Sequence, residues 1–361
     1  MFLTETTLLH ELEKTGFPPL KIESTSIINL NTKFDGKYSP DVILKLVWQE
    51  QSNSFITELV PIATPQNIFI AEQKLKQLGQ NIKNSANDKE TYYPLIVANY
   101  LKSSDLDKLV NNGISAIDLC GNGVIQVPGK WFIHRSGAKN LFPTTNPIKN
   151  VFAGNSSLVA RVFFSQDSFN SVNQVLKEIV LRQGNVTLST VSKVLKTLQE
   201  QLLITKNKEI NLLDAGKLLS ELSTNYQKPS VKRILIGKTS DINNVLSQLA
   251  SNSKTHNIEL VGFDPNLYAV MPSQNFTKIY TSNLDKLLID VNITETNRFP
   301  NIEIRETSDP IIYFDKRYKD GFYWTPPLQT YLELNSGDKR EQDTAKQIAT
   351  DLINLKYVGR K

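Results

Sequence analysis

Residues 170–214 decide the fold of the middle of this chain and read NSVNQVLKEIVLRQGNVTLSTVSKVLKTLQEQLLITKNKEINLLD. Two runs in this stretch have apolar residues at helical spacing. The first run contains Val172, Val175, Leu176, Ile179 and Val180, and the second contains Val191, Val194, Leu195 and Leu198. Gln183-Gly184-Asn185 breaks the chain between them. Short apolar segments at 202–204 and 210–213 then predict a hairpin. This order of elements is that of a winged helix-turn-helix.

The other face of the second predicted helix is polar and has no carboxylate. Its residues, with Thr187 just before it, are hydroxyls and cations: Thr187, Ser189, Thr190, Ser192, Lys193, Lys196 and Thr197. Lys206 and Lys208 lie between the two hairpin strands, where a wing contacts DNA backbone. Such side chains suit phosphates and base edges. The alternative is that the motif only packs, with solvated basic loops. We favour binding of double-stranded DNA.

The distribution of charge supports this choice. The chain carries 41 Lys and Arg against 36 Asp and Glu, a net charge of +5. Residues 149–232 alone hold eleven basic and six acidic side chains, which accounts for the whole excess. No acidic residue occurs between Asp118 and Asp167. Three basic residues of that run extend the predicted DNA surface, which suits a polyanion: Arg135, Lys139 and Arg161.

Length and composition limit the other classes of protein. With 361 residues, two or three domains are expected. No run of 18 apolar residues is present, so we expect no membrane partner. The start lacks the pattern of a signal peptide. Cys120 is the single cysteine, and the three histidines are scattered, so no disulfide, metal site or cofactor is predicted. These features indicate a cytoplasmic protein, associated with the nucleoid when bound to DNA.

We predict a mixed α/β, multidomain protein. Strands and helices alternate in residues 1–145, which predicts a mixed sheet flanked by helices. The turn chemistry of residues 142–147 indicates a linker. The winged helix-turn-helix is expected at 149–228 and a second α/β domain at 230–361.

The first domain carries two carboxylates at an informative spacing. Pro40-Asp41 opens one predicted strand, and Glu58 lies on the next, two residues before Val60. The pattern resembles the PD-(D/E)xK nuclease fold, in which two carboxylates hold Mg²⁺ and a lysine supports developing charge. Val60 occupies the lysine position, and nothing singles out Lys74 or Lys76 as a substitute. We therefore expect a degenerate, catalytically silent site in which Asp41 and Glu58 are vestigial. A Mg²⁺-dependent nuclease targeted by the winged helix is the alternative.

The chain also resembles the AbiEi family of antitoxins and transcriptional regulators of type IV toxin–antitoxin systems, in a long form. The similar stretches are residues 113–123, 156–162, 186–195, 329–334 and 337–340. The resemblance implies a sequence-specific autorepressor that neutralises a cognate nucleotidyltransferase-like toxin in phage defence. It also implies that the C-terminal domain is distantly like a nucleotidyltransferase. Residues 261–265 lack the serine of active transferases, so we expect a non-catalytic module.

A further expectation concerns how such a protein reads DNA. One winged helix offers few base contacts, and two-fold symmetry doubles them. We therefore expect a homodimer on a promoter inverted repeat.

Overall fold

The structure is a computed structural model that describes residues 3–25, 39–84, 91–142, 150–269 and 276–358. The chain is mixed α/β, as predicted, and divides into two compact units, residues 1–146 and 147–361. The segments 149–228 and 230–361, expected as separate domains, belong to the same unit. Lys149 and most of the expected linker lie outside the described residues. No helix in the described part of the chain is long and apolar enough to cross a membrane.

Unit 1 is built on one seven-stranded sheet whose strands follow the order of the sequence. Its elements are α1 (Glu5–Thr15), β1 (Lys21–Thr25), β2 (Val42–Trp48), β3 (Gln51–Val60), α3 (Pro65–Asn84), β4 (Tyr92–Ala98), α4 (Ser103–Asn111), β5 (Ser115–Asp118), β6 (Gly123–Val127) and β7 (Trp131–Arg135). Strands β3, β4 and β5 are parallel, and the other neighbours are antiparallel. A two-residue turn with positive φ at Gln49 and Glu50 joins β2 to β3.

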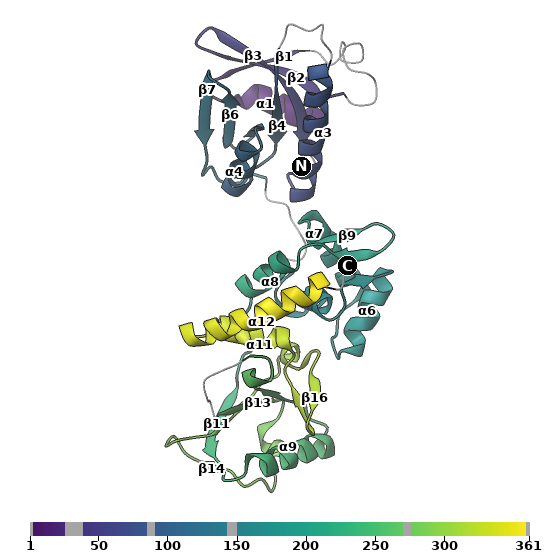
Figure 1. Ribbon diagram of the computed structural model, residues 1–361, viewed down its shortest axis with the longest axis vertical. Coiled ribbons are helices and arrows are strands. Elements are labelled where there is room, and N and C mark those ends of the chain that lie inside the picture. The colour runs from purple at the N-terminus through teal and green to yellow at the C-terminus, as the bar shows by residue number, and fades with distance from the viewer. Residues whose placement is uncertain (1–2, 26–38, 85–90, 143–149, 270–275, 359–361) are drawn as a thin grey trace. The chain divides into compact units, whose positions relative to one another are not determined.

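Helices cover both faces of this sheet (Figure 1). Leu8 and Leu12 of α1 pack on one face, in a core with Leu44. The opposite face packs against α3 and α4, in a core that includes Val60 and Leu75. Because side chains alternate along a strand, Glu58 lies on the same face of β3 as Val60. Glu58 is therefore directed toward the layer that contains α3.

The first half of unit 2 contains short helices around a small sheet. Its elements are η2 (Gly154–Ser156), α5 (Ser157–Arg161), η3 (Val162–Phe164), β8 (Ser168–Phe169), α6 (Val172–Leu181), α7 (Leu188–Glu200), β9 (Ile204–Lys206), β10 (Ile210–Leu212) and α8 (Ala215–Thr224). The strands pair in the order β8-β10-β9. Both helices begin at side-chain caps, Ser171 for α6 and Thr187 for α7. Val180, which the spacing placed on the apolar face, is instead 58% exposed.

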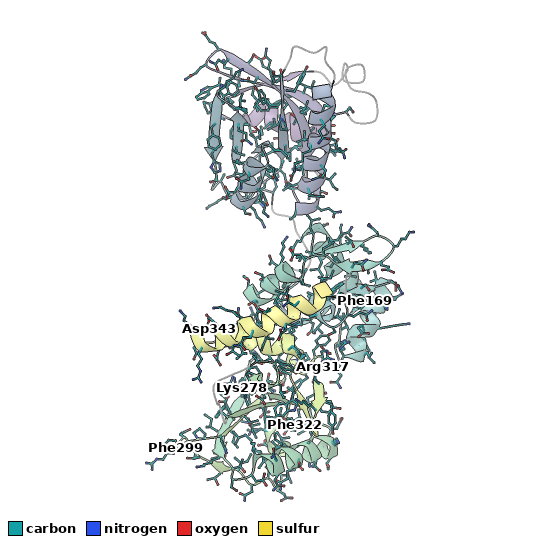
Figure 2. All side chains as sticks on the ribbon, in the orientation of Figure 1. Phe169, Lys278, Phe299, Arg317, Phe322 and Asp343 are labelled. Atoms are coloured by element: carbon teal, nitrogen blue, oxygen red, sulfur yellow. The ribbon has the colours of Figure 1, made fainter. Side chains whose placement is uncertain are left out.

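The second half of unit 2 is a seven-stranded sheet in the order β14-β11-β15-β13-β12-β17-β16. Its elements are β11 (Arg233–Lys238), α9 (Ile242–His256), β12 (Leu260–Phe263), η4 (Pro265–Leu267), β13 (Thr277–Thr281), α10 (Leu284–Leu287), β14 (Thr294–Glu295), β15 (Ile302–Glu306), η5 (Pro310–Tyr313), β16 (Arg317–Lys319), β17 (Phe322–Trp324), α11 (Pro327–Asn335) and α12 (Lys339–Val358). Figure 2 labels Phe322 in the core of this half and Phe169 in the helical half.

One hydrophobic core joins the two halves of unit 2. Leu195 and Phe169 from the first half belong to the same cluster as Tyr280, Leu332 and Ile348 from the second. Helix α12 of the second half packs on α11 of the same half and on α8 of the first half. The small helical half is therefore anchored on the α/β half.

Candidate functional site

Helix α7 has one buried and one exposed face. Val191, Val194, Leu195 and Leu198 are completely buried, as their spacing predicted. Ser189, Ser192, Lys193 and Lys196 are exposed and recur at i, i+3, i+4 and i+7, so they form one stripe. Lys196 lies 3.8 Å from Glu200 in a surface contact that is weak by its distance and exposure. The stripe thus keeps its positive charge available to a ligand.

The ends of α7 and the following hairpin add exposed polar groups. Thr187 caps the helix by accepting a hydrogen bond from the Thr190 backbone N–H at 3.2 Å. The Thr187 side chain therefore stabilises the N-terminus of α7. Thr190, three residues further on, is half-buried. Lys206 and Lys208 are exposed at the tip of the β9–β10 hairpin. Seven of the nine residues predicted on α7 and the hairpin are therefore exposed, whereas Thr190 is half-buried and Thr197 is buried.

Two residues predicted to contact DNA are buried, and the prediction is corrected for them. Thr197 is 9% exposed because it turns toward the packed side of α7 and donates to the Lys193 carbonyl. Arg161 is 5% exposed, with its guanidinium donating to Ser157 Oγ and Gln329 Oε1. The absence of acidic residues between Asp118 and Asp167 indicates net positive charge, but it does not indicate which basic side chains are buried. The burial of Arg161 could therefore not be predicted from this run.

Arg135 and Lys139 belong to unit 1, and both are exposed. The Arg135 guanidinium lies over the Phe17 ring, 5.1 Å from its centroid. Its Nη1 donates to the Pro18 carbonyl at 2.7 Å. Arg135 therefore stabilises the loop after α1. Lys139 makes no hydrogen bond or ion pair of this kind with the described residues.

The carboxylates of unit 1 acquire a lysine that the sequence motif lacks. Lys74 of α3 places its Nζ 2.8 Å from Glu58 Oε2. Lys76, two residues further on, pairs instead with Glu72 on its own helix. Val60, at the expected lysine position, packs in the core between the sheet and α3. The structure therefore singles out Lys74, which spacing along the strand could not.

Asp41 and Glu58 occupy different environments. Asp41 is half-buried, and its Oδ2 accepts a hydrogen bond from the Leu59 N–H at 2.8 Å. Glu58 is 2% exposed, and its Oε1 is buried without a hydrogen-bond partner among the described residues. An unpartnered buried oxygen is costly. Carboxylate oxygens are the kind of ligand that a divalent cation prefers.

Burial and neighbouring charges shift the pKa of Glu58 and of Lys74. Burial raises the pKa of Glu58 from 4.5 to about 7, and the charge of Asp41 adds to the rise, against the hydrogen bond from Lys74. The same hydrogen bond to Glu58 raises the pKa of Lys74. Perturbed groups of this kind cluster at functional sites. No set of three or more His, Cys, Asp or Glu side chains that could hold a metal occurs in the described ranges.

The stretch 113–123 contains a buried structural carboxylate. Asp118 is 1% exposed and accepts from the backbone N–H groups of Leu101, Cys120 and Asn122. The Asn122 Nδ2 donates a fourth hydrogen bond at 2.7 Å. Asp118 thus stabilises the turn between β5 and β6, and both of its carboxylate oxygens are engaged in hydrogen bonds within the fold.

The aspartates of the second half of unit 2 are engaged separately. Asp264 caps η4 by accepting from the Asn266 N–H, and Asp309 caps η5 through the Ile311 N–H. Asp285 pairs with Arg233 on the surface. These carboxylates do not form the strand pair that nucleotidyl transfer uses, within the part of the chain that the structure describes.

Comparisons of the chain with protein-family models, with curated proteins and with solved structures found no match.

Proposed function

We propose that residues 149–228 are a winged helix-turn-helix and that the protein is a sequence-specific DNA-binding regulator. The observation that carries the proposal is the exposed stripe Ser189, Ser192, Lys193 and Lys196 on a helix whose other face is fully buried. Helix α7 has 13 residues and is about 20 Å long, which suits a major groove. The hydroxyls supply hydrogen bonds to phosphates or bases, and the lysines supply counter-charge.

The wing extends this surface in the proposal. Lys206 and Lys208 on the β9–β10 hairpin contact the phosphate backbone next to the groove that α7 enters. The resemblance to AbiEi proteins extends the proposal to repression of the protein's own promoter, with a homodimer on an inverted repeat. It also suggests a cognate toxin as partner. Footprinting of the promoter tests the dimer, and protection of a single asymmetric half-site by a monomer would contradict it.

The salt dependence of DNA affinity tests the proposed interface. The double variant Lys193→Ala/Lys196→Ala should bind duplex DNA more weakly, and the slope of log K against log salt should fall by about two, one unit per lost phosphate contact. Lys254→Ala/Lys286→Ala is the matched control, because it removes the same charge from exposed lysines of α9 and α10. Equal affinity and slope in wild type and the α7 variant would remove this helix from the interface.

A second function, Mg²⁺-dependent DNA cleavage by unit 1, is favoured by the 2.8 Å contact between Lys74 Nζ and Glu58 Oε2. Asp41 and Glu58 would hold the cation, which would supply charge stabilisation at the phosphate. Lys74 would donate to a phosphate oxygen or orient the attacking water. The expectation of a silent site was based on Val60, and Lys74 removes that particular objection.

Plasmid cleavage decides between the silent and the active site. Wild type, Asp41→Ala and Lys74→Met are compared in Mg²⁺ and in Mn²⁺, with Lys76→Met as a control on the same helix. Cleavage by wild type and Lys76→Met but not by the other two variants would establish the nuclease. If no form cleaves, or all cleave equally, this second function is refuted and the regulator proposal is unaffected.

A further inference from the structure

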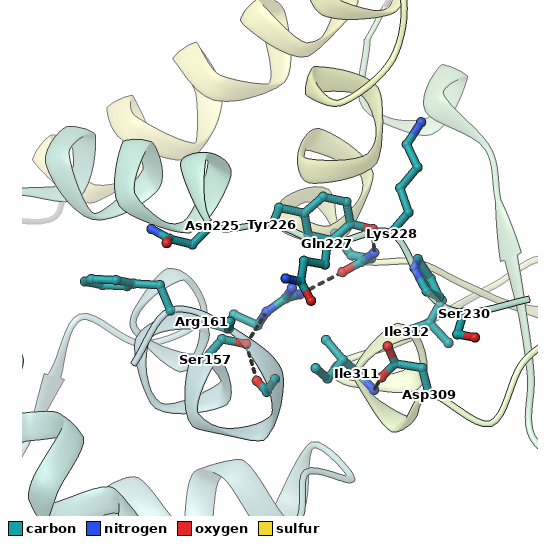
Figure 3. A pocket seen from close by; sticks show the side chains of 15 residues that line it. Ser157, Arg161, Asn225, Tyr226, Gln227, Lys228, Ser230, Asp309, Ile311 and Ile312 are labelled. Atoms are coloured by element: carbon teal, nitrogen blue, oxygen red, sulfur yellow. Dashed lines mark hydrogen bonds between the residues drawn. The ribbon is translucent and has the colours of Figure 1, made fainter. Parts of the chain in front are cut away.

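A cavity of about 190 Å³ lies inside unit 2, at the junction of its two halves. Its walls come from α5 and the turn before it, from residues 225–230 after α8, and from η5 with Gln329 of α11 (Figure 3). The volume corresponds to roughly six water molecules at about 30 Å³ each. The cavity is thus of a size to hold a small metabolite rather than a polymer.

Arg161 provides a buried positive charge in the wall of this cavity. Nε donates to Ser157 Oγ at 3.2 Å, and Nη1 donates to Gln329 Oε1 at 2.7 Å. Both partners are neutral, and no carboxylate forms an ion pair with Arg161 among the described residues. Nη2 has no acceptor within that same set of residues. Figure 3 shows the guanidinium reaching toward the middle of the lining side chains.

The surroundings of Arg161 do not neutralise it. Two carboxylates act on Arg161 through space without contacting it: Asp309, which lines the same cavity, and Glu333, which is separated from Arg161 by the Gln329 amide. Burial raises the pKa of Glu333, which weakens its claim to be a full counter-charge. Burial likewise lowers the pKa of Arg161 to about 10, which leaves the guanidinium charged at neutral pH. A buried charge without a counter-ion is unfavourable, and a bound anion would relieve it.

The remaining walls indicate the kind of anion. Gln227 and Ser230 add neutral polar groups, and Ile311 and Ile312 add an apolar surface. Asp309 lies on the wall opposite Arg161 in Figure 3, with Oδ1 accepting from the Ile311 N–H at 3.0 Å. Arg161 therefore favours an oxyanion at one end, whereas Asp309 favours a donor or cation at the other.

We propose that this cavity binds a small molecule that carries an oxyanion, a carboxylate or a phosphate, with Arg161 as its counter-charge. The guanidinium is suited to this task because its planar donors match two oxygens of such a group. The site is independent of the proposed DNA interface, since none of its lining residues belongs to α7 or the β9–β10 hairpin.

Isothermal titration of the full chain with two separate probes, inorganic phosphate and an α-amino acid such as L-valine, tests the site. Wild type should bind at least one probe saturably, and Arg161→Gln should weaken that binding at least tenfold. Arg298→Gln, which removes the same charge from an exposed position, should leave it unchanged. Because Arg161→Gln changes a buried residue, its thermal unfolding is measured alongside. Gln227→Ala, at an exposed position, gives a second variant, with several-fold weaker binding expected.

Asp309→Asn distinguishes the two sources of the oxyanion while keeping the cap acceptor of η5. It should tighten the binding of phosphate, because a repulsive charge is lost. It should weaken the binding of an amino acid, because its ammonium loses a partner. The proposal is overturned if wild type binds neither probe, if a folded Arg161→Gln binds as well as wild type, or if Gln227→Ala and wild type bind equally.

Discussion

The buried carboxylate of Glu58 should make unit 1 less stable at high pH than a neutral side chain would. Its pKa is raised from 4.5 in the unfolded chain to about 7 in the folded one. The folded state therefore holds a proton that the unfolded state releases between these two values. Below pH 4.5 both states are protonated and there is no penalty. As the pH rises through 7, the folded state must also ionise Glu58 and carries the full cost.

The size of the effect follows from the shift. Each pKa unit corresponds to about 1.4 kcal/mol, so a charged Glu58 costs about 3 kcal/mol above pH 8. Glu58→Gln removes the charge and keeps the size of the side chain. It should stabilise unit 1 by up to about 3 kcal/mol at pH 8 and by less than about 1 kcal/mol at pH 5. The pairing with Lys74 is already part of the shift, since its hydrogen bond lowers the pKa of Glu58.

Hydrogen-exchange mass spectrometry at both pH values measures this effect on peptides from β3 and β4, which report unit 1 alone. Glu11→Gln is the control, because Glu11 pairs with Lys14 in an exposed contact on α1 and should change stability by less than about 0.5 kcal/mol. A Glu58→Gln variant that is destabilised at pH 8, or equally affected at both pH values, would refute the reasoning. Glu58 would then be a well-stabilised member of a structural ion pair.

Three other substitutions test the packing that positions the sites. Asp118→Ala should destabilise unit 1 by about 3–5 kcal/mol in urea unfolding, because it strands four donors; exposed Asp107→Ala should be near neutral. Gly184→Ala should cost unit 2 about 1–3 kcal/mol, since its Cβ would lie 2.5 Å from Ile179 Cγ2. Gly79→Ala, on α3 with open space around it, should not destabilise unit 1 in the same assay. Asp315→Ala should lower the thermal stability of unit 2 by about 1–3 kcal/mol, because Arg182, Ser165 and Arg317 all donate to that carboxylate; an unchanged transition would show that these contacts contribute nothing.

Local patterns were sufficient where neighbours in sequence are also neighbours in space. The buried face of α7 and the strands β2 and β3 were predicted because periodicity reflects one packed side. The same approach fails at residues 311–314, where the apolar run IIYF predicts a strand. Pro310 at the start of the turn and the Asp309 cap make it a 3-10 helix. Val180 was misplaced because the apolar spacing of α6 extends onto its exposed side.

The sequence by itself determined the succession of the helices α6 and α7, the polar stripe of α7 and the position of Asp41 at the head of a strand. Each of these depends on spacing within a few residues, where backbone geometry fixes which side chains share a face. Only the tertiary structure brought Lys74 to Glu58, since the contact depends on how α3 packs on the sheet. Only the tertiary structure buried Arg161 as well, because its environment is made by α11, 168 residues away along the chain. Charge is readable in a sequence, but the solvent exposure that decides what a charge can do is a property of the packed chain.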